Sequence, residues 1–205
     1  MTEGPGQLSF EPDGAADGTA VPGLHYLPGW LAPDACRELL SLIEAGPWSA
    51  ELRRRVQHYG HRYDYGRRSV APEAAATAPP LPPWARDQAA RLVREGLTDR
   101  QPDQVIVNEY LPGQGISAHV DCVPCFGPVV AAISLGSDCV MDFTHPGDGT
   151  KTAVHLAPGS LCVMTGPARY DWRHGIAARK SDPGPLARVP RGRRVSVTFR
   201  SVLTA

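Results

Sequence analysis

Three residues of this chain, His119, Asp121 and His174, have the types and spacing that bind a redox-active metal ion. In an extended strand, residues i and i+2 point to the same side, so His119 and Asp121 would converge. A histidine from a later strand could complete one face of an octahedron. Two histidines and one carboxylate on a face, with the other positions open, suit non-haem Fe(II) oxygenases. Because an H-x-D pair also occurs in strands that hold no metal, the neighbouring residues must decide.

Polar residues on two other predicted strands could hold an organic anion. Asn108 and Tyr110 share one face of a strand, and Arg194 and Arg200 share one face of the last strand. An inward-facing arginine is costly unless it meets an anion, and its planar fork matches a carboxylate. This pair of arginines therefore favours a dicarboxylate ligand.

Short β-rich segments and two helices are expected to position these residues. Eight runs rich in β-formers are separated by Gly and Pro: 105–110, 116–121, 129–135, 139–143, 152–156, 160–164, 170–176 and 194–200. Before them, the apolar spacing predicts helices over 33–45 and 83–95. Helices followed by antiparallel strands predict an α+β fold: a double-stranded β-helix, or jelly-roll, core with N-terminal helices that buttress one sheet.

Length and charge limit the possible classes. The 205 residues fit one domain, which we expect over 21–205, after a flexible tail at 1–20 that is rich in Gly, Ala, Pro and Asp. Basic and acidic residues balance at 21 each, so no global field draws the protein to nucleic acid or membrane. Arginines cluster locally, however, within 51–70 and again within 188–200.

The N-terminus and the cysteines indicate where the protein works. The chain starts without a basic and apolar leader, and no apolar run approaches the ~20 residues that span a bilayer. We therefore expect a cytoplasmic protein without membrane contact or an obligate protein partner. An odd count of five scattered cysteines favours reduced thiols. Cys122 and Cys125 form a C-x-x-C pair that can signal zinc or redox chemistry, but no second pair completes a zinc site.

Five motifs, in order along the chain, resemble those of the AlkB-like Fe(II)/2-oxoglutarate oxygenases. They are Asn108-x-Tyr110-x-Pro112-Gly113, Ile116-x-x-His119-x-Asp121, Ser134-Leu-Gly136, Arg169-Tyr-Asp-Trp172-Arg-His174-Gly-Ile176 and Arg194…Thr198-Phe-Arg200. Within that family, the phrases at 108–116, 140–143 and 161–166 look most like the oxygenase part of the animal AlkB homologue that modifies the wobble uridine of tRNA.

The resemblance implies a dioxygenase that uses Fe(II), 2-oxoglutarate and O2. His119, Asp121 and His174 would bind Fe(II). The residues implied for 2-oxoglutarate are Asn108, Tyr110, Arg194 and Arg200, with one arginine at each carboxylate end. The implied reaction is oxidation of an alkyl group on a nucleobase, with oxidative dealkylation of nucleic acid. Open alternatives are hydroxylation of a modified tRNA wobble uridine, hydroxylation of a protein side chain or small metabolite, and a non-catalytic nucleic-acid-binding module.

The aromatic and basic segment 51–70 occupies the position of the family's nucleotide-recognition lid. Tyr63 and Tyr65 share a face in an extended chain, and Arg67 lies beside them. Aromatic rings stack bases and arginines take phosphates, which suits a single-stranded or flipped nucleotide of tRNA or of alkylated DNA or RNA. The alternative is a strand whose tyrosines pack on the core.

Three further positions bear on the substrate. Arg169 and Trp172 lie close to His174 in sequence and are candidates for the substrate pocket. Val123 stands where the bacterial repair enzyme of the family has an acidic residue that helps to read an exocyclic amine. The base, the alkyl group and the choice between DNA and RNA therefore stay open.

Overall fold

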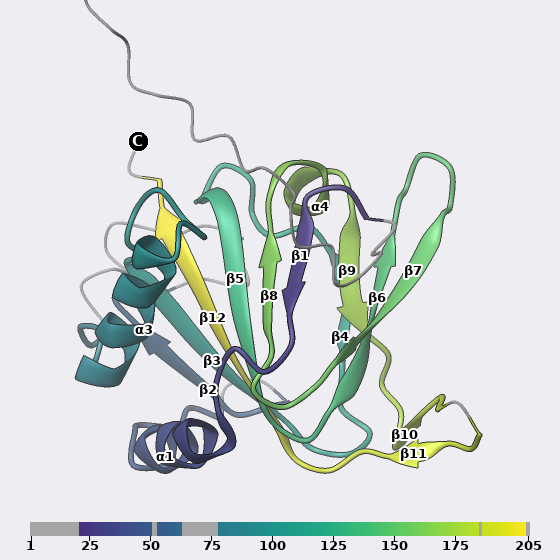
Figure 1. Cartoon of the computed structure of the whole chain (residues 1–205), viewed down its shortest axis with the longest axis horizontal. Coiled ribbons are helices and arrows are strands. Elements are labelled where there is room, and N and C mark those ends of the chain that lie inside the picture. The colour runs from purple at the N-terminus through teal and green to yellow at the C-terminus, as the bar shows by residue number, and fades with distance from the viewer. Residues whose placement is uncertain (1–20, 51–52, 63–77, 185, 204–205) are drawn as a thin grey trace, which may run out of the picture.

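A computed structural model describes residues 21–50, 53–62, 78–184 and 186–203, which fold into two antiparallel sheets with helices on one side (Figure 1). The strands are β1 (Leu24–Leu27), β2 (Val56–Tyr59), β3 (Gln104–Tyr110), β4 (Ile116–His119), β5 (Phe126–Gly136), β6 (Cys139–Thr144), β7 (Lys151–Leu156), β8 (Leu161–Met164), β9 (Arg173–Ile176), β10 (Ser181–Asp182), β11 (Val189–Pro190) and β12 (Arg194–Val202). The larger sheet has the order β1-β8-β5-β12-β3-β2, the smaller one β4-β9-β6-β7, and β10 pairs with β11. This is the predicted jelly-roll core.

The helices α1 (Pro33–Glu44) and α3 (Pro83–Arg94) cover the outer face of the larger sheet (Figure 1). Ile43 of α1 and Leu92 of α3 are fully buried in one apolar cluster with Val107 of β3. Proline occupies the first turn of each helix, where its missing N–H costs nothing. The predicted buttress is confirmed, and each predicted helix ends within one residue of the observed end. None of the helices in the described ranges is long and apolar enough to cross a bilayer.

Strand β12 shows how the alternation of side chains builds both the core and a cavity. Val195, Val197 and Phe199 are fully buried against the helices. The intervening residues Arg194, Ser196, Thr198 and Arg200 line a cavity on the other face of the sheet. Because side chains alternate with a period of two, one strand supplies apolar packing to one side and polar groups to the other.

Several element boundaries differ from the prediction. The segment 170–176 is a strand only from Arg173, because Gly166–Tyr170 forms the short helix α4. The strand predicted over 116–121 ends at His119. The strands β1, β10 and β11 were not predicted; they are two to four residues long, too short to show an alternating pattern.

The segment 51–70 is described only over 53–62, where part of it is an edge strand. Val56–Tyr59 pair with β3 as strand β2. The ring of Tyr59 is buried and meets Trp84 edge-on, with ring centroids 5.7 Å apart. These four residues therefore follow the alternative reading, a strand packed on the core, and not the lid. The tyrosines at 63 and 65, like the expected tail at 1–20, lie outside the described residues.

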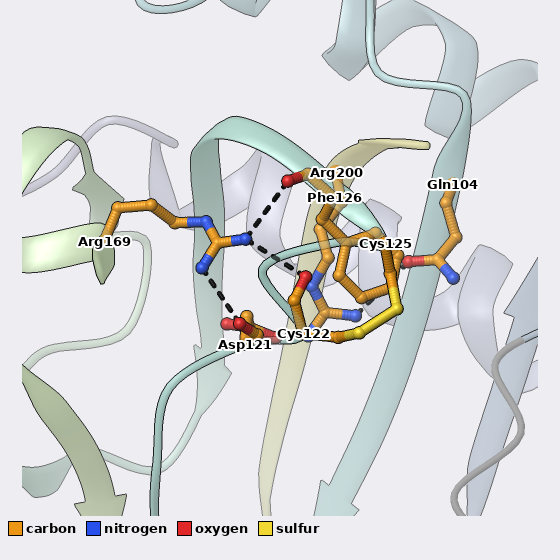
Figure 2. Close-up of a disulfide and its surroundings, with 7 residues drawn as sticks. All are labelled: Gln104, Asp121, Cys122, Cys125, Phe126, Arg169 and Arg200. Carbon is orange, nitrogen blue, oxygen red and sulfur yellow. Dashed lines mark hydrogen bonds and ion pairs between the residues drawn. A yellow bond between two sulfur atoms is a disulfide. The ribbon is translucent and has the colours of Figure 1, made fainter. Parts of the chain in front are cut away.

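The expectation that all cysteines are reduced is wrong for Cys122 and Cys125, which form a disulfide (Figure 2). A tight turn, in which the backbone N–H of Cys125 donates to the carbonyl of Cys122 at 3.2 Å, brings their Cα atoms to 5.2 Å. That separation lies within the range that a disulfide requires. The odd number of cysteines did not exclude a disulfide, because two cysteines in one turn can pair while the other three stay free. Cys36, Cys139 and Cys162 are free and buried.

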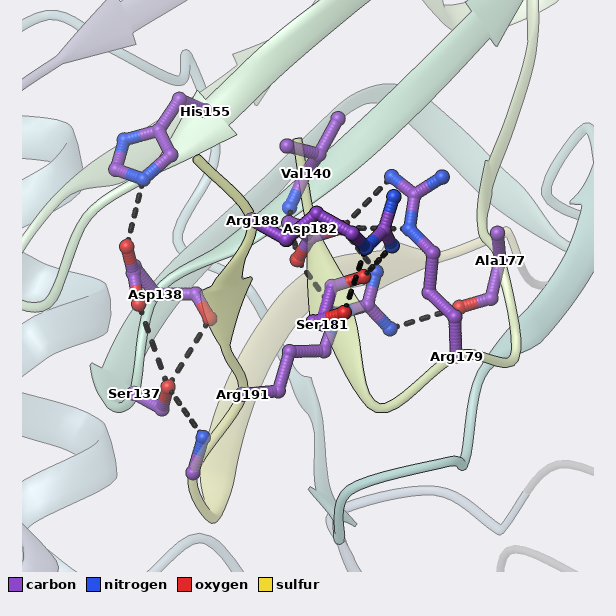
Figure 3. A network of polar contacts seen from close by, with 11 residues as sticks. Ser137, Asp138, Val140, His155, Ala177, Arg179, Ser181, Asp182, Arg188 and Arg191 are labelled. Carbon is purple, nitrogen blue, oxygen red and sulfur yellow. Dashed lines mark hydrogen bonds and ion pairs between the residues drawn. The ribbon is translucent and has the colours of Figure 1, made fainter. Parts of the chain in front are cut away.

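A buried carboxylate anchors the β10–β11 hairpin to the smaller sheet (Figure 3). Asp182 accepts hydrogen bonds from Arg191 at 2.5 and 2.7 Å, from Arg179 at 2.7 Å and from the backbone N–H of Val140 at 3.2 Å. Burial raises the pKa of Asp182, but these hydrogen bonds outweigh it and hold the pKa at about 2. Arg191 is therefore an interior ion-pair partner, not part of an exposed basic surface.

Replacing Asp182 with asparagine is expected to lower the free energy of unfolding by about 3 kcal/mol, because Arg191 would stay buried without its counter-charge. The folded pKa of Asp182 lies below its ordinary value of 3.8, so its stabilising contribution is present above about pH 4 and is lost as the pH falls toward 2. Urea unfolding of both proteins at neutral and at acidic pH measures this difference. The exposed Asp87→Asn variant is the control, and an equal effect of both substitutions at neutral pH would contradict the prediction.

Candidate metal centre and its cavity

His119, Asp121 and His174 converge as the sequence predicts. His119 is the last residue of β4 and lies opposite His174 of β9 in the strand register, with ring centroids 4.5 Å apart. Asp121 follows in the loop after β4, and its Oδ2 lies 3.5 Å from Nε2 of His174. One potential ligand atom from each side chain lies within 4.8 Å of the other two. A cross-strand pair and a loop residue thus form a three-ligand face.

The protonation states of the triad suit a divalent cation. Burial lowers the pKa of His174 to about 4, so this imidazole is neutral near pH 7. Burial raises the pKa of Asp121, but neighbouring positive charge, above all that of Arg200, outweighs it and holds the pKa below its ordinary value. Nδ1 of His119 lies 2.8 Å from the carbonyl of Ser117, which leaves Nε2 as its ligand atom. An ionised carboxylate and a neutral imidazole are the states in which Asp121 and His174 can bind metal.

A narrow cavity of about 60 Å³ lies beside the triad, between the two sheets. All four residues predicted for the dicarboxylate line it: Asn108, Tyr110, Arg194 and Arg200. Arg194 pairs in register with Tyr110 across β12 and β3, and its Nη2 donates to Oγ of Ser134 at 2.9 Å. Ser196 and Thr198 also line the cavity, and the strand alternation that singled out the arginines could have found them too.

The cavity fits a bound carboxylate because Arg194 has unused donors. Its side chain is buried, and among the described residues no hydrogen-bond partner reaches its Nε or Nη1. A buried guanidinium with unpaired N–H groups is costly unless an anion meets it. Each of these unpaired N–H groups can donate to a carboxylate oxygen. The donor set beside the triad therefore fits 2-oxoglutarate.

Arg200 differs from Arg194 because it already has a carboxylate partner within the protein. Its Nη2 lies 2.6 Å from Oδ1 of Asp121, and its Nη1 donates to Oε1 of Gln104 at 3.2 Å (Figure 2). Arg200 thus pairs with the acidic member of the triad while it also lines the cavity, and its contact with the second end of a bound dicarboxylate remains a prediction. This ion pair orients the carboxylate and keeps it ionised.

Arg169 and Trp172 do not open onto the cavity, which corrects their expected contact with substrate. The Arg169 side chain is 2% exposed, and its guanidinium donates to backbone carbonyls of the loop that carries Asp121 (Figure 2). Trp172 is 6% exposed and packs in the apolar cluster between the sheets, with its ring 5.3 Å from that of His145. The expectation rested on closeness to His174 in sequence, and the short helix α4 and the turn after it carry both side chains into the interior instead.

A wider opening of about 680 Å³ lies next to the triad. Its walls include Arg54 and Arg173 together with His119 and Asp121. Nε of Arg54 donates to Oδ1 of Asn108 at 2.9 Å. The sequence offered no signal for Arg173 beyond its place next to His174. The remaining substrate candidates, Tyr63, Tyr65 and Arg67, lie outside the described residues.

The sequence is similar to proteins of one oxygenase family. Residues 23–200 match the family described as the 2OG-Fe(II) oxygenase superfamily. A Macaca fascicularis protein named tRNA (carboxymethyluridine(34)-5-O)-methyltransferase ALKBH8 is 41% identical over 165 residues, which cover 73% of this chain and 24% of that protein. A Mus musculus protein named alpha-ketoglutarate-dependent dioxygenase alkB homolog 7, mitochondrial, is 31% identical over 184 residues, which cover 85% of this chain and 76% of that protein.

The fold also has a solved counterpart. The structure of OsALKBH1 matches 88% of this chain and 97% of its own, with a TM-score of 0.65 and 20% sequence identity, which supports the jelly-roll fold. The chain spans about a quarter of the length of the macaque relative. Fe(II), 2-oxoglutarate and O2 are the reagents of the matched family, and the triad and Arg194 fit the first two. The chain belongs to the 2OG-Fe(II) oxygenase superfamily, among its AlkB-like members.

Proposed function

We propose that this protein is an Fe(II)- and 2-oxoglutarate-dependent dioxygenase that oxidises an alkyl group on a nucleobase. The observation that carries the proposal is the closeness of two sites: a His, Asp and His face, with Asp121 and His174 buried, lies directly beside a cavity in which Arg194 has unused donors. A metal ion and a dicarboxylate bound there would be neighbours. The wider opening reaches the same triad and provides room for a third reactant.

Each protein group has a separate task in this proposal. His119, Asp121 and His174 hold Fe(II), and Arg194 binds one carboxylate of 2-oxoglutarate. Burial raises the pKa of Tyr110, which keeps its phenol protonated as a hydrogen-bond donor to the co-substrate. When bound, iron and 2-oxoglutarate supply oxidation of a C–H bond by O2, with release of succinate and CO2. The sheets bury Asp121 and His174, and the wider opening gives access to the triad.

Nucleic acid is the proposed substrate class. The macaque relative's name refers to tRNA, and the wall of the wider opening carries Arg54 and Arg173, which can contact phosphates. The C-terminal arginines offer less positive charge to a nucleic acid than their number in the sequence indicates. Arg193 pairs with Glu44 and Glu109, Arg191 with Asp182 and Arg200 with Asp121. Tyr63, Tyr65 and Arg67 remain predicted substrate contacts.

The proposal is tested by loading the protein anaerobically with Fe(II) and 2-oxoglutarate and exposing it to O2 with tRNA or with methylated oligonucleotides. Mass spectrometry of the nucleic acid should show loss of a methyl group, with formaldehyde and succinate as products. A gain of one oxygen would indicate the second candidate, hydroxylation of a modified wobble uridine, which the likeness to the macaque protein favours. Absence of any mass change in every nucleic acid would contradict both.

The lid prediction separates nucleic acid from other substrates. A Tyr63→Ala/Arg67→Ala variant should bind oligonucleotides more weakly and turn them over more slowly than the wild type. Unchanged binding and turnover would favour a protein side chain or a small metabolite. As a control, thermal unfolding measurements should show that the variant is folded at the assay temperature. The cytoplasmic location and the absence of an obligate protein partner remain predictions.

A further inference from the structure

The loop that carries Asp121 is held from behind by one buried arginine (Figure 2). Nη1 of Arg169 donates to the carbonyl of Asp121 itself at 3.0 Å. Its other nitrogens donate to the carbonyls of Gly127 at 3.2 Å, Phe126 at 3.2 Å and Cys122 at 3.4 Å. A single guanidinium from α4 thus binds the beginning of the loop at Asp121 and Cys122 and the start of β5 at Phe126 and Gly127.

Arg169 is a charged residue in a part of the protein that is otherwise mostly apolar. The residue is 2% exposed, and its four hydrogen-bond acceptors are neutral carbonyls. Burying a cation is costly, so it is retained only where its hydrogen bonds are well satisfied. The same carbonyls would need other donors if Arg169 were absent. The arrangement therefore fixes one backbone path from Asp121 to Gly127, and with it the direction of the Asp121 side chain.

The disulfide closes the same loop a second time. Cys122 directly follows Asp121, and its bond to Cys125 spans the turn between two of the carbonyls that Arg169 binds. The carbonyl of Cys125 accepts a hydrogen bond from the backbone N–H of Leu203 at 2.9 Å, which fastens the turn to the end of β12. Both cysteines are less than 10% exposed and pack with Phe126 and Val202.

We propose that Arg169 is a positioning residue for the metal ligand Asp121 and that the Cys122–Cys125 disulfide is a second tie on the same loop, so that metal affinity depends on its thiol–disulfide state. The inference rests on the proposed role of Asp121 as a ligand of Fe(II). A dithiol reduces the loop: the Sγ–Sγ bond breaks, each sulfur gains one electron and one proton, and the dithiol becomes a disulfide. A disulfide oxidant reverses the change.

The first test is anaerobic titration with Co(II), a probe whose absorption reports ligand geometry. Arg169→Gln should bind Co(II) about 10- to 100-fold more weakly, which is the usual effect of losing a partner that orients a ligand. Arg169→Lys should recover part of the loss, because an ammonium keeps the charge but cannot span four carbonyls. If both folded variants bind Co(II) as the wild type does, with an unchanged spectrum, Arg169 does not position Asp121.

The matched control is Arg86→Gln. Arg86 is exposed on α3, and its Nη1 donates to the carbonyl of Leu81 at 2.8 Å, which is the same kind of contact away from the metal centre. This variant should keep the Co(II) affinity and spectrum of the wild type. Urea unfolding of each variant identifies the conditions in which it is folded, and titrations are compared only there.

The second test changes the disulfide alone. Wild-type protein is reduced with dithiothreitol, freed of reductant under anaerobic conditions and titrated with Co(II) beside the oxidised form. The reduced protein and a Cys122→Ser/Cys125→Ser variant should both bind about 10-fold more weakly than the oxidised protein, at the lower end of the effect of an orienting partner. Equal affinities of all three forms would overturn the redox part. Tighter binding by the reduced wild type alone would also overturn it, because the thiolates would then be ligands.

An Asp121→Asn variant separates this inference from the proposed function. If Asp121→Asn loses Co(II) binding while the Arg169 variants and the reduced protein keep it, the metal centre stands and the two ties do not control it. If Asp121→Asn binds Co(II) as tightly as the wild type, the proposed metal centre itself is wrong. The proposed metal centre and the positioning role of Arg169 and the disulfide are both supported only if Co(II) binding is weakened in Asp121→Asn, in the Arg169 variants and in the reduced protein.

Discussion

Replacing His119 with alanine is expected to abolish succinate formation. His119 lies opposite His174 across two strands and is one of three side chains whose ligand atoms lie within 4.8 Å of one another. Losing a partner that only orients a ligand costs about 10- to 100-fold in metal affinity, and losing the ligand itself should cost more. Anaerobic titration with Fe(II), followed by succinate measurement after exposure to O2, tests both parts.

The matched control for this substitution is His155→Ala. His155 is exposed, and its Nε2 lies 2.7 Å from a carboxylate oxygen of Asp138, so it is a histidine with an acidic neighbour away from the triad (Figure 3). Its loss should leave Fe(II) affinity and succinate formation unchanged. Succinate formation at the wild-type rate by folded His119→Ala would rule out the metal centre described here.

The second large effect is expected for Arg194→Gln, which should raise the KM for 2-oxoglutarate about 100-fold. Truncating one partner of a buried, charge-assisted pair costs about 2–5 kcal/mol, and each 1.4 kcal/mol corresponds to a factor of ten. In the described structure Nε and Nη1 of Arg194 have no partner, whereas Nη2 donates to Ser134, so the substitution removes two donors to the co-substrate together with one internal hydrogen bond. Succinate formation at varied 2-oxoglutarate measures KM and kcat separately.

Fe(II) affinity gives the control within the same variant. Arg194 is not a member of the triad, so Arg194→Gln should bind Fe(II) as the wild type does in the absence of 2-oxoglutarate. Arg91→Gln, on the outer helix α3, should leave both affinities unchanged. An unchanged KM in Arg194→Gln would mean that the dicarboxylate binds elsewhere.

Much of the site follows from periodicity along single strands. Residues two apart on an extended strand share a face, which places Asn108 beside Tyr110 and Arg194 on the inner face of β12. The same rule fails where no strand forms. Arg169 belongs to the short helix α4, so its closeness to His174 in sequence did not bring its side chain to the cavity. The disulfide between Cys122 and Cys125 was not predicted from the number of cysteines, because its formation depends on the geometry of one turn.

The sequence by itself determined the helices, most of the strands and the membership of the triad, since these depend on local periodicity and on residue type. Only the tertiary structure decided which charges meet. Arg169 reaches the carbonyl of Asp121 across 48 positions of sequence, and Arg200 pairs with the Asp121 carboxylate while Arg194 keeps unused donors. Arg169, Arg194 and Arg200 thus have three different sets of partners. Their roles differ because burial makes each charge depend on the partner that the fold brings to it, and local sequence does not specify that partner.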